Sequence, residues 1–549
     1  MRIIPEEQRM SAAGATLHGW PPPAPSALRR AWRSLSRRPW LLALAICTLV
    51  VVVARLGPDW PAQEFRAQLA HDVGLTAWND QWYGGHPLSG YSLLYPPFAA
   101  VFGAAFTGVL ACVGCTWLVS RLLPPVDAGR RWFGIAAAVC VAGNLFLGQV
   151  PFLLGLFFGL AAFLAVLRAA PSRSATTVVA LLAAASSLAS PLAGFFLLLA
   201  AFAWAFDVGW RRALPLGAAV AGSVLSLIAG GSAGPFPFPW DGLMDLMIFV
   251  GATLVLVPRR YGLLRRFVLV YALVAVASFV IPNPIGGNVI RLAQLFAVPA
   301  AFWMLTRHRK ALAVLGIALL PALVWQFWPI GSAAARAAGD PSVNASYYTG
   351  LLRFLSTQNP ADGRLEIPFT REHWEAARVA PYFPIARGWE RQTDYKYDAV
   401  LYDTLTPATY RQWLASAGVD LVALPDAPID YGGRAEKQLL AHPPAYLVPV
   451  WHDAHWKVWR VAGAKPLVSG AATLVKLGTS SFELHFSQPG DAVVRVRMSS
   501  LWQVANGQGC VLPAEPDGWV HVRATEAGDL TARARLTFAA MLPSTSDPC

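Results

Sequence analysis

Long apolar runs, separated by short polar breaks, occupy the chain from residue 40 to residue 331. Apolar runs of roughly 17–25 residues are long enough to cross a bilayer as helices. The pattern predicts about eleven such spans, which together form a transmembrane domain over 40–331. The expected spans are residues 40–56, 95–119, 132–149, 151–168, 175–189, 191–206, 212–230, 242–257, 266–281, 290–305 and 311–329.

One connection between spans is much longer and more polar than the others. It covers residues 57–94, with the sequence GPDWPAQEFRAQLAHDVGLTAWNDQWYGGHPLSGYSLL, and concentrates acids, histidines and aromatic residues. A connection of this kind predicts a small folded element held over the bilayer surface. We expect the chemistry of the protein to take place there.

The pattern changes beyond residue 331, where apolar runs shorten and charged residues become frequent. Residues 332–463 contain both helix and strand patterns. The amphipathic stretch 410–418 ends at a glycine, and the apolar run 419–425 follows it. This order of a helix and a strand predicts an α/β domain. Residues 464–549 contain short alternating runs between turn residues, a pattern typical of a β-sandwich. The expected fold is a polytopic α-helical membrane protein with these two C-terminal domains.

The composition agrees with a membrane protein. Hydrophobic residues make up 55% of the 549 positions and charged residues 14%, and the mean hydropathy is +0.45. Soluble domains usually contain about 25% charged residues. The formal net charge of +13 would suggest nucleic acid in a soluble protein, but much of it lies in short loops between spans, without an aromatic-interleaved basic groove. The sequence therefore predicts the lipid bilayer as a partner, and no nucleic acid.

Basic residues of the membrane domain fall almost wholly into alternate connections between spans. They are Arg29, Arg30, Arg33, Arg37, Arg38, Arg121, Arg130, Arg131, Arg168, Arg173, Arg211, Arg212, Arg259, Arg260, Arg265, Arg266, Arg307, Arg309 and Lys310. Loops rich in arginine and lysine stay in the cytoplasm. The alternation predicts a multi-pass plasma-membrane protein with a basic cytoplasmic tail at 1–39. Loop 57–94 and everything after residue 331 are then extracytoplasmic.

Asp59 lies just after the first span, at the expected outer boundary of the membrane. An ionisable group within the apolar zone costs about 2.5–3.5 kcal/mol on insertion scales, so such a group usually has a function. Gln63, Glu64 and Arg66 follow within two helical turns and supply polar partners. The alternative is that Asp59 is a wetted turn or helix-cap residue.

Other side chains of the long loop suit a metal or a substrate. His71, Asp72 and Asp80 are weak candidates for metal ligands, because carboxylates suit Mg²⁺ or Mn²⁺ and imidazole suits softer ions. Their spacing matches no metal motif, so no cofactor is predicted, although a divalent metal stays open. A second set is expected either to line the substrate site or to form an interfacial aromatic belt: Trp82, Tyr83, His86 and Tyr91.

Arg291 breaks the charge alternation, because it is the only basic residue in any of the short connections expected outside the cell. It follows the turn PNPIGGNV, in which Gly286 and Gly287 permit close backbone approach and Asn288 offers a hydrogen-bonding amide. A guanidinium at the membrane face can bind phosphate through two hydrogen bonds. The alternative is an arginine that extends to the interface at a helix start.

The six cysteines show no metal-ligand pattern. Cys112 and Cys115 lie in an apolar span, as packing residues do, whereas Cys510 and Cys549 both fall in the predicted extracytoplasmic region, where a disulfide between them is plausible. No P-loop, HExxH motif, nucleophile elbow or dinucleotide fingerprint is present. Their absence argues against ATP-driven transport and against a zinc protease.

The chain resembles the GT-C superfamily of polyprenyl-phosphate-dependent membrane glycosyltransferases, in its arabinofuranosyl- and mannosyltransferase-like, actinobacterial form. The resemblance covers nearly the whole chain. It rests on the span pattern, on the long first loop with an acid near its start, and on local sequences. These sequences are DWPAQEFR, WYGGHPLSGYSLLYPP, LGQVPFLLGL, ASPLAGFF and PIGGNVIRL.

The resemblance implies an inverting transfer of a sugar from a polyprenyl-phosphate donor to an extracytoplasmic cell-envelope glycan. Asp59 would be the general base, with Glu64 as a second catalytic acid, although arabinofuranosyl members often have adjacent acids in this loop and these two are separated. Arg291 would stabilise the departing lipid phosphate, with Asn288 and Arg66 in the same donor site. Two alternatives from other classes stay open: a multi-span secondary transporter and a non-catalytic cell-envelope assembly protein.

Overall fold

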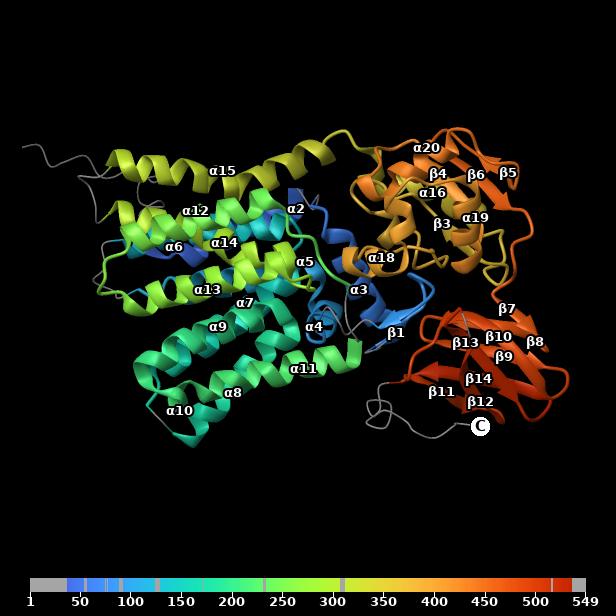
Figure 1. Cartoon of the computed structure of the whole chain (residues 1–549), viewed down its shortest axis with the longest axis horizontal. Helices are drawn as coiled ribbons and strands as arrows, with labels where there is room; N and C mark the ends of the chain where they lie inside the picture. Colours follow the sequence, from blue (N-terminus) through green and yellow to red (C-terminus); the bar gives the residue numbers. More distant parts are fainter. Residues whose placement is uncertain are drawn as a thin grey trace, which may run out of the picture.

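The computed structural model describes residues 37–53, 57–74, 76, 78–87, 92–123, 129–170, 172–230, 234–306, 312–514 and 517–535. These residues form a helical domain and, at one end of it, a C-terminal half of sheets and short helices (Figure 1). Most of the predicted tail 1–39 lies outside the described residues, as do Tyr91 and Cys549.

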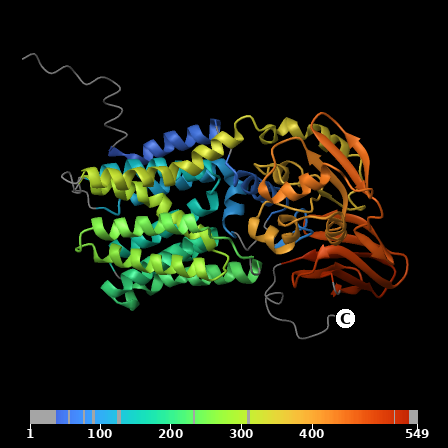
Figure 2. The same ribbon diagram turned by 45° about the horizontal axis from the view of Figure 1, so that its top comes forward.

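The helical domain consists of helices that run mostly along its long axis (Figures 1 and 2). They are α2 (Pro39–Val53), α3 (Trp60–Val73), α4 (Tyr95–Phe102), α5 (Ala104–Val119), α6 (Arg130–Phe146), α7 (Val150–Arg168), α8 (Arg173–Ala189), α9 (Pro191–Val208), α10 (Trp210–Ala213), α11 (Ala218–Gly230), α12 (Trp240–Leu256), α13 (Gly262–Val280), α14 (Ile290–Leu305) and α15 (Leu312–Ala337). Each predicted span coincides with one or more of these helices. Among the described residues, four helices are long and apolar enough to cross a membrane, and one bent pair would add a fifth. The number of eleven spans stays a prediction.

The range 95–119, predicted as one straight span, is broken at Gly103. The axes of α4 and α5 differ in direction by 112°. Gly103 has φ +81°, a conformation that glycine adopts without the steric cost that a side chain would add. The bend brings α4 against α3, where the Tyr95 hydroxyl donates a hydrogen bond to the Gln63 carbonyl at 3.1 Å. The broken span therefore supports the helix that follows Asp59.

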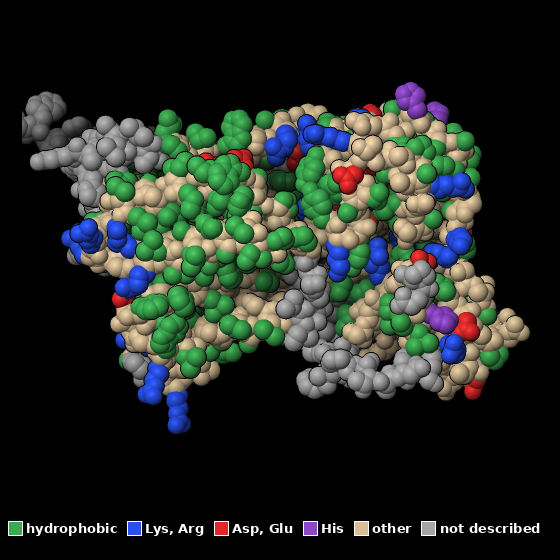
Figure 3. Space-filling view, viewed as in Figure 1, with side chains coloured by type: hydrophobic (Ala, Val, Ile, Leu, Met, Phe, Trp, Pro, Cys, Tyr) green, Lys and Arg blue, Asp and Glu red, His purple; other side chains and the backbone are tan. Residues whose placement is uncertain are grey.

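Apolar side chains dominate the face of the helical domain seen in Figure 3, whereas the C-terminal half shows a mixed surface. Large exposed apolar residues occur on several helices: Leu181, Trp240, Val255, Leu273, Val280 and Leu320. Soluble monomers rarely expose continuous apolar surface on this scale. The helical domain has the surface of a protein surrounded by lipid.

The first C-terminal domain contains a four-stranded sheet in the order β3-β4-β6-β5. Its elements are α16 (Thr349–Leu355), β3 (Arg364–Glu366), α17 (Glu375–Arg378), α18 (Arg391–Tyr397), α19 (Pro407–Ser416), β4 (Val419–Pro425), α20 (Arg434–Leu440), β5 (Leu447–His452) and β6 (Trp456–Val461). The strands β3 and β4 are parallel, and β6 and β5 continue the sheet antiparallel. A capping box at Thr406 begins α19, and Gly418, at φ +67°, turns the chain into β4.

The second C-terminal domain consists of two four-stranded antiparallel sheets, β12-β13-β10-β7 and β11-β14-β9-β8, that share one hydrophobic core. The strands are β7 (Val468–Gly470), β8 (Ala472–Gly478), β9 (Ser481–Phe486), β10 (Gly490–Arg497), β11 (Trp502–Asn506), β12 (Gly509–Ala514), β13 (Trp519–Ala524) and β14 (Gly528–Ala534). Alternate side chains point into the core, as in Phe482, Leu484 and Phe486 of β9. This arrangement follows from the period-two pattern of the sequence.

The hairpin of the long first loop is buried against the C-terminal half. Its place over the bilayer surface stays a prediction. After α3 the loop forms the short hairpin β1 (Trp78–Asn79) and β2 (His86–Pro87), which lies against both C-terminal domains (Figure 1). The Gln81 carbonyl accepts from the Ile385 amide at 2.9 Å, and the Gly84 carbonyl accepts from the Arg497 amide at 2.8 Å. Trp78 joins the core of the sandwich. The loop therefore ties the helical domain to both C-terminal domains.

A buried ionic cluster supports the first C-terminal domain. The Arg387 guanidinium, 1% exposed, binds both carboxylate oxygens of Asp394 at 2.8 and 2.9 Å and one oxygen of Glu436 at 2.9 Å. Removal of one member of a buried ion pair leaves its partner without compensation and costs about 3–5 kcal/mol. The stability of this domain therefore depends on Arg387.

We expect Arg387→Met to lower the free energy of unfolding of the C-terminal half by about 3–5 kcal/mol, because Asp394 and Glu436 would stay buried without their cation. Thermal unfolding of the full chain in detergent, followed by tryptophan fluorescence, measures the change. Arg523→Met is the matched control, since Arg523 pairs with Asp491 at an exposed position. Equal shifts of Tm in the two variants would contradict the assignment.

Candidate functional site

The start of α3 is pressed against the turn between α6 and α7. The Asp59 amide donates to the Leu147 carbonyl at 3.2 Å, and the Trp60 indole donates to the Phe146 carbonyl at 3.1 Å. A Cβ on Gly148 would lie 2.5 Å from the backbone nitrogen of Trp60, so only glycine permits this approach. The backbone at Asp59 is thus held at a fixed place on the helical domain.

A second tight turn places Arg291. The Asn283 side-chain oxygen accepts from the amides of Ile285 and Gly286, each at 2.9 Å. Gly286 has φ +45°, and a Cβ there would lie 1.9 Å from the Phe236 carbonyl oxygen. Helix α14 begins directly afterwards, with Arg291 in its first turn. A cation at this end opposes the helix dipole, so its position requires another interaction.

That interaction is with Asp59. The Arg291 Nη2 lies 3.9 Å from the Asp59 Oδ2, and the two side chains are 20% and 26% exposed. Both line a pocket of about 430 Å³. The other lining residues come from α15, from the turn between α6 and α7, and from the residue before Asp59: Trp328, Pro329, Ser332, Arg336, Leu147, Gln149 and Pro58. The structure places Asp59 and Arg291 in one pocket. Their joint action stays a prediction.

Burial raises the pKa of the Asp59 carboxyl, and the positive charges of Arg291 and Arg66 oppose part of that rise. A raised pKa means that the carboxylate binds a proton more strongly than an ordinary aspartate does. A base is most effective when its pKa approaches the working pH. The pocket therefore contains a carboxylate suited to accept a proton beside a cation suited to bind an anion.

The sequence analysis did not predict the other pocket residues, and three of them can contribute to its chemistry. Arg336 lies near the end of α15, which continues past the predicted limit of the last span. The Gln149 side-chain oxygen is buried, and no residue of the described chain hydrogen-bonds to it. Trp328 is 71% exposed and lies on α15 beside Pro329. The turn Gly148–Pro151 can be recognised in the sequence, but no sequence pattern indicates that it lies near Arg336.

The other predicted catalytic and donor-site residues do not line this pocket. Glu64 and Arg66 are on α3, and Asn288 is in the turn before α14. Arg66 is buried, and its Nη2 lies 3.5 Å from the Glu390 Oε2. Arg66 still affects the site, because its charge acts on the pKa of Asp59.

The expectation that Trp82, Tyr83 and His86 line the substrate site is wrong for the described structure. Their exposed fractions are 0%, 1% and 3%, because the hairpin is enclosed by the C-terminal domains. The Trp82 indole donates to the Ala376 carbonyl at 3.2 Å and stacks on Phe65. Burial also lowers the pKa of His86 to about 3, so this imidazole is neutral at physiological pH. Tyr91 lies outside the described residues.

The weak metal candidates do not converge. His71 and Asp72 are exposed on α3, whereas Asp80 is buried in the hairpin. Within the described ranges, no group of three or more histidine, cysteine, aspartate or glutamate side chains is arranged to hold a metal ion. Cys510 is buried on β12, and its predicted partner Cys549 lies outside the described residues, so the disulfide stays a prediction.

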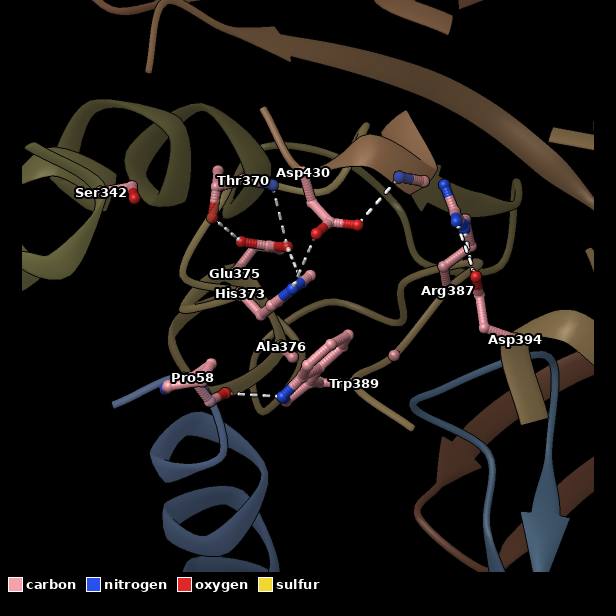
Figure 4. Close-up of polar contacts among 12 residues, drawn as sticks. Pro58, Ser342, Thr370, His373, Glu375, Ala376, Arg387, Trp389, Asp394 and Asp430 are labelled. Atoms are coloured by element: carbon pink, nitrogen blue, oxygen red, sulfur yellow. Dashed lines mark hydrogen bonds and ion pairs between the residues drawn. The ribbon is translucent and has the colours of Figure 1, made fainter. Parts of the chain in front are cut away.

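The first C-terminal domain reaches the pocket through Trp389. Its indole donates to the Pro58 carbonyl at 2.6 Å, directly before Asp59 (Figure 4). The Trp389 ring stacks on His373 with centroids 3.4 Å apart. His373 has φ +60° and lies 3.8 Å from the Asp430 carboxylate. Two separate parts of the chain therefore hold the segment that carries Asp59.

No protein-family model and no curated protein sequence matches this chain. Two solved structures are similar in fold. The arabinofuranosyltransferase AftD from Mycobacteria is 16% identical, with a TM-score of 0.43; the match covers 80% of this chain and 42% of that one. The archaeal oligosaccharyltransferase AglB from Archaeoglobus fulgidus, solved with an inhibitory peptide and a dolichol-phosphate, is 13% identical, with a TM-score of 0.37 and coverage of 73% and 70%.

This chain spans less than half the length of AftD. At these identities the likeness concerns the fold, and it assigns no activity, donor or catalytic residue.

We expect Trp389→Phe to loosen the start of α3, because phenylalanine keeps a ring against His373 but cannot donate to the Pro58 carbonyl. The loss of one such hydrogen bond costs about 0.5–1.5 kcal/mol. Hydrogen–deuterium exchange of the full chain in detergent should become faster in residues 57–63. Trp451→Phe, which alters a ring stacked on Phe354, is the control. Unchanged exchange in residues 57–63 of Trp389→Phe would refute this role.

Proposed function

We propose that this protein is a membrane glycosyltransferase that moves a sugar from a polyprenyl-phosphate donor to a glycan acceptor of the cell envelope. The observation that carries the proposal is the pairing of Asp59 with Arg291 at 3.9 Å in one pocket, which Arg336 also lines. A carboxylate with a raised pKa beside two guanidinium groups fits a reaction in which a hydroxyl loses a proton and a phosphate departs.

Asp59 is the general base in this proposal. Its carboxylate takes the proton of the acceptor hydroxyl while the acceptor oxygen forms a bond to the anomeric carbon of the sugar. The bond from that carbon to the phosphate oxygen breaks, and its electron pair leaves with the lipid phosphate. Attack opposite the leaving group inverts the anomeric configuration. The side-chain amide of Gln149 faces the same pocket and can hydrogen-bond to the sugar.

Arg291 and Arg336 stabilise the leaving lipid phosphate. Negative charge grows on the departing oxygen during the reaction, so cations positioned beforehand stabilise the transition state more than the ground state. Guanidinium groups match phosphate oxygens through paired hydrogen bonds. Arg291 begins α14 and Arg336 ends α15, so the phosphate would bridge two helices.

The lipid tail lies along α15 in this proposal. Leu320, Val324 and Trp328 are spaced four residues apart, share one helix face and are 65%, 54% and 71% exposed. Trp328 also lines the pocket, so the apolar stripe starts where the phosphate binds. A polyprenyl chain can cover this stripe while its phosphate reaches Arg291.

The proposed orientation follows the arginine alternation. About eleven spans, a cytoplasmic N-terminus and extracytoplasmic C-terminal domains put the pocket on the outer side of the plasma membrane. The contact between Trp389 and Pro58 brings the C-terminal half close to Asp59. The acceptor glycan would approach from this side, with the β-sandwich available to orient it.

The two alternatives make different demands on these residues. A secondary transporter requires a polar path at midplane depth between repeats. The polar pocket instead lies at the end of the helices that faces the C-terminal half, between Pro58 and Arg336. A non-catalytic assembly protein has no need of a carboxylate with a raised pKa beside two arginines. A glycosyltransferase accounts for both features.

We expect Asp59→Asn to reduce sugar transfer by about 10²- to 10⁴-fold, because the amide cannot accept the proton. Arg291→Ala is expected to reduce kcat by about 10²- to 10³-fold, because the leaving phosphate loses a stabilising charge. The assay follows transfer from a panel of polyprenyl-phosphate sugars by the full chain in proteoliposomes. Arg460→Ala, on the remote strand β6, is the control. Full transfer activity in both pocket variants would refute the proposal.

We expect Leu320→Gln to raise KM for a decaprenyl donor by about fivefold to tenfold while leaving KM for a geranyl donor unchanged. Leu320 lies about 12 Å along α15 from Trp328, at roughly 1.5 Å per residue, so a geranyl tail ends before it. Burial of a leucine-sized contact accounts for a change of this size. Leu273→Gln, at a similarly exposed position on α13, is the control. An equal rise for the two donors would exclude a tail site on α15.

A further inference from the structure

Glu372 occupies an unusual position beside the pocket. It lies in the connection between β3 and α17, and its side chain is 1% exposed. Neither of its carboxylate oxygens has a hydrogen-bond partner in the described part of the chain. Its Oε1 lies 3.9 Å from the Arg336 Nε and 4.0 Å from the Arg371 Nε. The carboxylate is therefore held by charge rather than by hydrogen bonds.

Arg371 has other partners, whereas Arg336 faces the pocket. The Arg371 guanidinium donates to the Arg336 carbonyl at 2.7 Å and lies 3.5 Å from the Asp340 carboxylate. Among the ion pairs of the described residues, Arg336 has one, and it is with Glu372. The Arg336 side chain is 44% exposed, and its residue also lines the pocket. Arg336 therefore pairs with a buried carboxylate and also lines the open pocket.

We propose that Glu372 is a positioning residue that competes with the donor phosphate for Arg336 and so sets how strongly the pocket binds it. This inference rests on the proposed function, because it takes the phosphate of a lipid donor as the ligand of Arg336. It adds a residue of the C-terminal half to the donor site. The binding strength of that site then depends on the charge state of Glu372.

The surroundings of Glu372 make its charge state variable near neutral pH. The charged groups that face it are Arg336 of α15, Arg371 beside it, Asp340 after α15 and Asp430 before α20. Burial is the largest influence and raises the pKa of Glu372 to about 7; the two arginines oppose the rise, and the two aspartates add to it. Glu372 is neutral below this pH and ionised above it.

The direction of the coupling follows from linkage. A phosphate in the pocket draws Arg336 away from Glu372, so binding raises the pKa of Glu372 further. A ligand that raises a pKa binds more tightly in the protonated state. The affinity for a phosphate of constant charge should therefore fall as pH rises through about 7. A further shift of one unit corresponds to a roughly tenfold change in affinity.

The test measures binding of farnesyl methyl phosphate, a phosphodiester whose single negative charge does not titrate between pH 6 and pH 8.5. Isothermal titration calorimetry uses the full chain in detergent micelles. In the wild-type protein the Kd should rise about tenfold between these pH values. Glu372→Gln should bind at both pH values with the wild-type Kd of pH 6. Arg336→Gln should bind more weakly at pH 6 and show no pH dependence.

Two controls isolate Glu372 from the other acids. Glu375→Gln alters a neighbouring buried glutamate, whose pKa is raised by burial to about 8 but whose carboxylate hydrogen-bonds to Thr370. It should keep the wild-type pH dependence. Asp491→Asn alters an exposed acid of the β-sandwich and should also keep the tenfold change.

The outcomes separate this inference from the proposed function. Absence of wild-type binding at every pH would overturn the proposed donor site itself. Wild-type binding that does not change with pH, or a pH dependence that persists in Glu372→Gln, would overturn the role of Glu372 alone. If Glu372→Gln does not fold, the Arg336→Gln variant provides the test. Loss of the pH dependence in Arg336→Gln supports the proposal, and a retained pH dependence overturns it.

Discussion

The enclosure of the first loop by the C-terminal half is the contact on which the rest of the site depends. The loop leaves the helical domain at Asp59, and its hairpin is buried between two domains that come more than two hundred residues later in the chain. Trp82 at its tip is fully buried, and Tyr83 bonds to the backbone of Gly388. Because this hairpin cannot move independently, the segment around Pro58 is held from both sides. A charged pocket at a domain boundary needs that rigidity to keep its geometry.

The pocket contains one carboxylate, of Asp59, and two guanidinium groups, of Arg291 and Arg336, and it is partly buried. Asp59 and Arg291 lie 3.9 Å apart, which is too far for a hydrogen bond, so each retains capacity for another partner. Arg336 and Glu372 are also 3.9 Å apart, so this pair is likewise too far apart for a hydrogen bond. Charges that are near one another without full hydrogen bonding are costly in a folded protein unless a ligand completes them. The pocket differs in this respect from the contacts of Arg387 with Asp394 and Glu436, which are hydrogen bonds of 2.8–2.9 Å.

The local pattern of apolar and turn residues was enough to predict most helices and strands of the fold. Periodicity placed the helices, including α19 followed by β4, because apolar spacing and turn residues act over short distances. The same local reasoning treated 95–119 as one straight span, since the bend at Gly103 depends on how α4 packs against α3. It also assigned Trp82 and His86 to a surface. Aromatic residues look alike in sequence whether they face a membrane, a substrate or the interior of another domain.

The pattern of apolar and polar residues was enough to predict the helices of the first part and the sheets of the last part. It also singled out Asp59 and Arg291 as charged residues at an apolar boundary. An ionised group at an apolar boundary is costly, so its presence is informative without any structure. The folded chain was needed to show that Gln149 and Arg336 line the same pocket, that Glu372 lies beside Arg336, and that the hairpin residues are buried elsewhere. These memberships depend on contacts between distant segments, and contacts at long range leave no pattern along the chain.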